Sequence, residues 1–148
     1  MDLNNKPLGD HQLYKEAVMD EVGIAFKLHE QINFYWHFYV PSTIALLGWI
    51  FAGTGSWPWN KRIAISVAFA GFIVFNLLAL VKSYTALEAV VNELRSSSAA
   101  SALNTEVLSA TISRLDMGPW EIGIVFHLVL DFGVLYFILI WSGRKITT

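Results

Sequence analysis

The sequence predicts an all-α integral membrane protein with about three transmembrane helices. Three observations lead to this prediction: the chain is unusually apolar, three long windows carry almost no charge, and aromatic residues flank those windows. Of the 148 residues, 55% are hydrophobic, and the mean hydropathy is +0.49. A soluble domain of this size does not need so much apolar material for its core.

The three windows cover residues 34–53, 63–81 and 120–141. Each is close to the roughly 20 residues that an α-helix needs to cross about 30 Å of hydrocarbon. Tryptophan and tyrosine prefer the headgroup level of a bilayer. Trp120 and Trp141 bracket the third window, and the first window opens with Tyr35, Trp36 and Tyr39. The link between the first two windows is short, so these two spans are expected to form an antiparallel hairpin.

Outside the windows, apolar residues recur at helical spacing in two regions. Residues 1–33 are expected to form an amphipathic N-terminal helix, ahead of the transmembrane hairpin at 34–81. Residues 82–119 are expected to form an extramembrane helical segment with a polar break at 96–101. Residues 120–148 then complete the chain with the third span and a short basic C-terminus.

The extramembrane segment carries apolar stripes that a small chain has difficulty covering. The first stripe contains Leu87, Val90, Val91 and Leu94, and a second one ends at Leu115. We therefore expect a partner surface, either in a homo-oligomer or in a larger membrane complex, in addition to the lipid bilayer itself.

Charge and cysteine content exclude several classes of function. The net charge of −2 is too close to neutral to indicate a nucleic-acid partner. Without cysteine, the chain has no disulfides, thiolate metal sites or cysteine nucleophile. The basic residues next to the span ends, Lys61, Arg62, Arg144 and Lys145, favour a cytoplasmic location for the hairpin and the C-terminus.

Asp131 is the most informative residue, because it falls near the middle of the third window. A carboxylate there costs about 2.5–3.5 kcal/mol on insertion scales, so it should face protein or water rather than lipid. His127 lies one helical turn earlier on the same face. Depth matching places Asn76 of the second span and His37 of the first span in the same half of the membrane.

Three interpretations of these four polar residues remain open. They could form hydrogen bonds that hold the helices together, line a path for ions or protons gated by Asp131 and His127, or ligate haem through His37 and His127. No phosphate loop, nucleophile elbow or zinc motif indicates an enzyme, and no cofactor other than haem is suggested. The hypothesis we carry forward is a small oligomeric membrane protein that forms or gates an ion- or proton-conducting path. The alternative is an accessory subunit that braces a larger membrane complex, respiratory or photosynthetic for instance.

Overall fold

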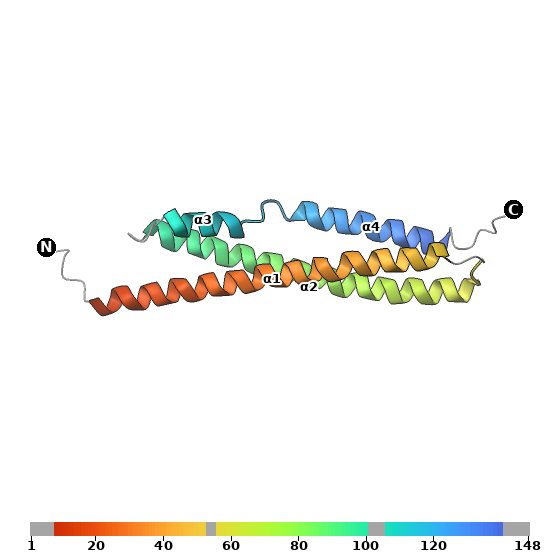
Figure 1. Ribbon diagram of the computed structural model, residues 1–148, viewed down its shortest axis with the longest axis horizontal. Coiled ribbons are helices and arrows are strands. Elements are labelled where there is room, and N and C mark those ends of the chain that lie inside the picture. Colours follow the sequence, from red (N-terminus) through yellow and green to blue (C-terminus); the bar gives the residue numbers. More distant parts are fainter. Residues whose placement is uncertain (1–7, 53–55, 101–105, 141–148) are drawn as a thin grey trace. The chain divides into compact units, whose positions relative to one another are not determined.

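The computed structural model describes residues 8–52, 56–100 and 106–140. Within these residues the chain is all-α and contains no strand, which confirms the helical part of the predicted fold class (Figure 1). In chain order the helices are α1 (Leu8–Ala52), α2 (Trp59–Ala100), α3 (Glu106–Leu115) and α4 (Glu121–Leu139).

Two of these helices are longer than the sequence windows. The N-terminal amphipathic segment and the first window form the single helix α1, which continues on both sides of Pro41. The second window and the stripe after it form the single helix α2. The sequence predicted a polar break at residues 96–101, but α2 continues as a helix to Ala100, so this prediction is wrong for residues 96–100. Residues 101–105 lie outside the described residues.

By their contacts, the residues divide into two compact units. Unit one contains residues 1–31 and 83–118, and unit two contains residues 32–82 and 119–148. Helices α1 and α2 therefore contribute to both units, whereas α3 belongs to unit one and α4 to unit two.

Unit one buries the apolar stripe of α2 within the chain. Leu87, Val91 and Leu94 are buried, as are Ile112 and Leu115 of α3. The sequence argument for a partner rested on this stripe being left uncovered. The chain covers it by itself, so the stripe does not indicate a partner surface.

A charged turn ends α3 in unit one. Asp116 accepts a hydrogen bond from the backbone N–H of Gly118 at 3.0 Å and forms an ion pair with Arg95 of α2. The bond from Gly118, and secondly the Arg95 guanidinium, lower the pKa of the Asp116 carboxyl below its ordinary value. Gly118 has a φ of 61°, in the left-handed region that favours glycine.

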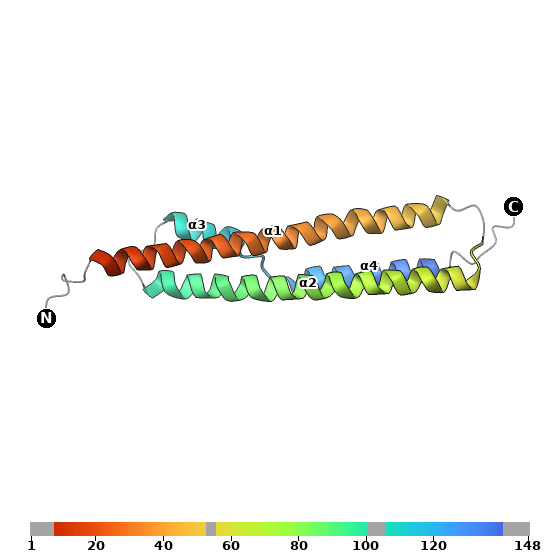
Figure 2. The same cartoon turned by 90° about the horizontal axis from the view of Figure 1, so that it is seen from below.

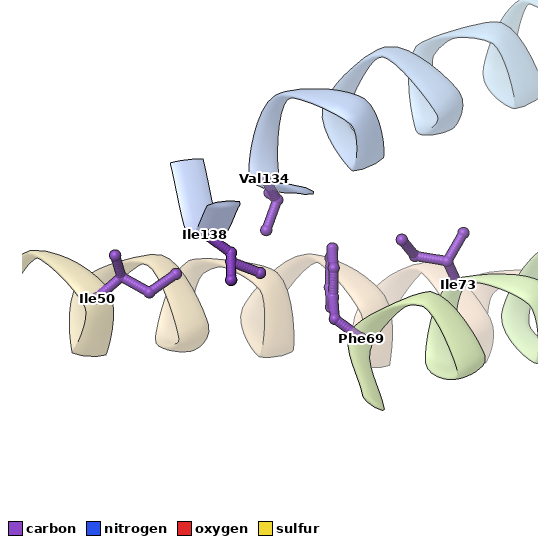
Figure 3. Close-up of a cluster of buried hydrophobic side chains, with 5 residues drawn as sticks. All are labelled: Ile50, Phe69, Ile73, Val134 and Ile138. Atoms are coloured by element: carbon purple, nitrogen blue, oxygen red, sulfur yellow. The ribbon is translucent and has the colours of Figure 1, made fainter. Parts of the chain in front are cut away.

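Unit two packs the second part of α1, the first part of α2 and α4 side by side, as both orientations of the ribbon show (Figures 1 and 2). Part of its core is an apolar cluster supplied by all three helices (Figure 3). The side chains of this cluster are Ile50, Phe69, Ile73, Val134 and Ile138.

The buried residues follow the spacing of three and four that is typical of left-handed helical bundles. Along α4, buried positions come at intervals of four, three and four residues. Along α2, buried positions at intervals of three or four residues occur in the parts that belong to both units. The buried residues of α2 at these intervals are Ser66, Phe69, Ile73, Asn76, Leu80, Ser83, Leu87, Val91 and Leu94.

Two helical stretches, Trp59–Ser96 and Glu121–Leu139, are long and apolar enough to cross a membrane. The second part of α1 does not meet the same test. Its Tyr, Trp, His and Pro residues lower its hydropathy, although they are common near the ends of membrane helices.

Candidate functional site

Helix α4 turns the side chains of His127 and Asp131 inward, whereas those of Phe126 and Phe132 point outward. His127 is 0% and Asp131 is 2% exposed, on the face that also carries Val134 and Ile138. Phe132, the next residue after Asp131, is 70% exposed. The helical register therefore places both polar groups of α4 against α1 and α2 of unit two.

Asp131 accepts two hydrogen bonds from different helices. The hydroxyl of Tyr39 on α1 donates to Oδ1 at 2.7 Å, and Nδ1 of His127 donates to Oδ2 at 2.6 Å. Both carboxylate oxygens are thus occupied, and the second bond joins residues one turn apart on α4. This arrangement compensates much of the cost of burying a carboxylate.

Asn76 extends the network to α2. Its Oδ1 lies 3.1 Å from Nε2 of His127, so both ring nitrogens of the histidine face oxygen atoms. Two protonation states satisfy these contacts. In the first state, an imidazolium donates through both nitrogens. In the second, a neutral ring donates from Nδ1 to Asp131, and its Nε2 accepts from the Asn76 amide nitrogen after the amide flips to exchange its oxygen and nitrogen.

Aromatic rings surround the imidazole of His127. The Tyr39 ring stacks on it with a centroid distance of 3.8 Å, and the Trp36 ring meets it edge-on at 5.7 Å. The ring of Phe72 on α2 stacks in turn on the ring of Tyr39, with a centroid distance of 6.2 Å. The rings and the Asp131 carboxylate together enclose the imidazole, which has no exposed surface.

Depth matching thus identified three members of a four-residue network, and His37 is not one of them. Its side chain is exposed, and its Nδ1 lies 2.7 Å from the backbone oxygen of Asn33 on the preceding turn. The structure brings His127, Asp131 and Asn76 together, and it places His37 on a different face of α1.

Tyr39 is the member that the sequence argument missed, because it was treated as a marker of the membrane boundary. The spacing of α1 contains the signal that identifies it. Ala25, Ile32 and Tyr39 are buried at intervals of seven residues, and Thr43 and Ile50 continue the same face. A heptad-spaced tyrosine among core positions indicates an inward-facing hydroxyl.

A groove of about 290 Å³ lies beside Asn76 on unit two. Aromatic rings of α1 and α2 make up most of its lining, among them those of Phe34, Phe38, Phe72 and Phe75. The groove is therefore mostly apolar, and its polar side chains are those of Tyr35 and Asn76.

The arrangement bears on the possible ligation of haem or metal. Both ring nitrogens of His127 are engaged in hydrogen bonds, so an iron bound there would have to displace one of them. Across residues 8–52, 56–100 and 106–140, no group of three or more histidine, cysteine, aspartate or glutamate side chains is placed to hold a metal ion.

Comparisons with protein-family models, with curated proteins and with solved structures gave no match. What the network does must therefore follow from its own geometry and chemistry.

Proposed function

We propose that this chain is a non-enzymatic integral membrane protein that crosses the bilayer three times and serves as a structural subunit of a larger membrane assembly. Helices α2 and α4 supply two spans, and the part of α1 in unit two supplies the third. Phe34, Ile44 and Phe51 of that part are all more than half exposed. Such an apolar surface is stable against lipid and costly against water.

The polar network carries the structural role. Its four side chains come from three helices, lie inside unit two and bond to one another. Polar groups between membrane helices stabilise association by about 0.6–2 kcal/mol each. A polar layer among heptad positions also fixes helix register, because a shift by one turn leaves its donors and acceptors unpaired. We infer that the network locks the three spans in one register.

The proposed partner surface lies on unit one. Leu13, Met19, Ile24 and Phe26 of α1 and Val107 of α3 are large apolar side chains that stay exposed in this unit. The four residues of α1 lie outside the stretch of α1 that we assign to the bilayer, so lipid does not account for their exposure. A second membrane protein of the same assembly is the occupant we propose.

Affinity purification from the native membrane, followed by native mass spectrometry, tests the structural role. We expect different subunits to accompany the wild-type chain, and Ile24→Glu to reduce their recovery. Lys27→Glu is the matched control, because it alters charge three residues away on an exposed position without removing apolar surface. Recovery of the bare chain from wild-type membranes, or equal recovery of partners by both variants, would contradict the proposal.

One observation favours a second candidate, the ion or proton path. Tyr39, Asp131, His127 and Asn76 form an unbroken chain of hydrogen bonds that contains three titratable groups. Conduction requires this chain to exchange protons with water on both sides.

Proton flux into vesicles under an imposed potential separates the two candidates. The structural role predicts the same flux for vesicles with wild-type protein and for empty vesicles. A path predicts a higher flux in the wild-type vesicles, with a rate or pH dependence that changes in Asp131→Asn.

A further inference from the structure

Two cations stand next to each other at the start of α2 in unit two. Lys61 and Arg62 belong to its first turn, and Lys61 is exposed. Among the described residues, no carboxylate forms an ion pair with Lys61 or Arg62. This end of unit two therefore carries positive charge that the described chain does not balance.

Indole rings hold both cations. The Lys61 ammonium lies 4.4 Å from the centroid of the Trp57 ring and 5.2 Å from that of Trp49. The Arg62 guanidinium lies 4.9 Å from the centroid of Trp59. Rings at these distances attract a cation while leaving its remaining N–H donors available to an anion.

The two cations differ in their contacts with the rest of the fold. Arg62 donates from Nη1 to the backbone oxygen of Leu139 at 2.6 Å, which satisfies a carbonyl in the last turn of α4. This bond fixes the start of α2 beside the end of α4. The Lys61 ammonium makes no comparable bond to the backbone of the described residues, where it contacts the rings of Trp49 and Trp57.

We propose that Lys61, together with Trp49, Trp57 and Trp59, binds the phosphate of an anionic phospholipid headgroup. The inference rests on the proposed membrane insertion, because that places the start of α2 and the end of α4 at headgroup depth. Tryptophan prefers this depth, where its ring meets apolar chains and its N–H reaches polar oxygens. An unbalanced ammonium beside two indoles, with a third indole against the neighbouring Arg62, has the charge and the amphiphilic surroundings that such a headgroup needs.

Native mass spectrometry of the purified full-length chain tests the site. Phosphatidylglycerol and phosphatidylcholine with identical acyl chains are titrated in turn, and their apparent dissociation constants are compared. One lysine near an anionic surface corresponds to about a fivefold preference for the anionic lipid. We expect that preference in the wild type and in Lys61→Arg, and its loss in Lys61→Gln. Trp49→Leu keeps the charge and removes one ring, so it should give an intermediate preference.

The controls separate this site from general charge effects. Lys27→Gln removes an exposed lysine from unit one, and it should keep the wild-type preference. Inorganic phosphate at ten times the lipid concentration should not displace the lipid. A wild type without preference, a preference retained in Lys61→Gln, or displacement by phosphate would each overturn the proposal.

Membrane insertion is measured separately, by alkaline carbonate extraction of the native membranes. Release of the chain into the carbonate supernatant would overturn both the proposed function and the lipid site. Retention in the membrane, with equal affinity for the two lipids, would overturn the lipid site alone.

Discussion

Replacing Asp131 by leucine should destabilise the chain much more than replacing it by asparagine. Leucine removes both acceptor oxygens, and the Tyr39 hydroxyl and the His127 Nδ1 lose their partner. The bond from Tyr39 joins α1 to α4, whereas the bond from His127 lies within α4. At about 0.6–2 kcal/mol for each bond, the loss amounts to roughly 1–4 kcal/mol. The orphaned donors stay buried, because His127 is 0% exposed, so we expect the upper half of this range.

Asparagine can replace every bond of the network without the charge. Its Oδ1 accepts from Tyr39, and its Nδ2 donates to Nδ1 of a neutral His127. The Nε2 of that histidine then donates to Asn76. The expected change in the free energy of unfolding is below about 1 kcal/mol.

Reversible unfolding by increasing fractions of SDS in mixed micelles, followed by far-UV circular dichroism, measures both variants. Phe132→Leu is the matched control on the same helix, because its side chain points outward and the substitution should leave stability unchanged. If Asp131→Leu unfolded at the same SDS fraction as Asp131→Asn, the network would not hold the helices together.

Three further predictions concern unit one, and chemical unfolding of the full chain measures each of them. Gly118→Ala should lower the free energy of unfolding by about 1–2 kcal/mol through backbone strain, because φ is 61°. A steric clash does not contribute, since nothing lies within 4 Å of an added Cβ. An unchanged stability would show that the turn relaxes freely. Asp116→Asn should lower stability at neutral pH and not at strongly acidic pH. The lowered pKa of Asp116 stabilises the fold above the ordinary carboxyl pKa, and this contribution disappears as the pH falls through the folded-state value, so a deficit that persisted in acid would contradict the assignment. Leu94→Ala should cost about 2–5 kcal/mol, because Leu94 is completely buried, and a loss below 1 kcal/mol would mean that its stripe packs loosely.

The sequence was a good guide to depth and a poor guide to direction around a helix axis. Depth follows from 1.5 Å of rise per residue, and it correctly grouped Asn76 with His127 and Asp131. Direction requires knowing which face is buried. His37 and Tyr39 differ by only two residues, but two residues are about 200° around the helix. The histidine therefore lies outside the network, and the tyrosine lies within it.

A similar limit applies to the stripe formed by Leu87, Val91 and Leu94. Its apolar character was evident from the sequence, and the structure confirms that these residues share a buried face. What covers that face depends on contacts between segments far apart in the chain. Spacing within one segment contains no information on them, so the sequence suggested a partner where the chain covers the stripe itself.

The distribution of the network over the three helices has a consequence for biogenesis. Helix α4 contains both of the network's most polar side chains, and every partner from another helix belongs to the α1–α2 hairpin. On its own, α4 would enter the bilayer with its carboxylate and imidazole bonded only to each other, without the partners from α1 and α2. The ribosome completes the hairpin first, so Tyr39 and Asn76 are already in place when α4 emerges. In the proposed membrane topology, insertion of α4 is therefore coupled to that of the hairpin, and a chain with a defective hairpin would expose α4 as a substrate for membrane proteolysis.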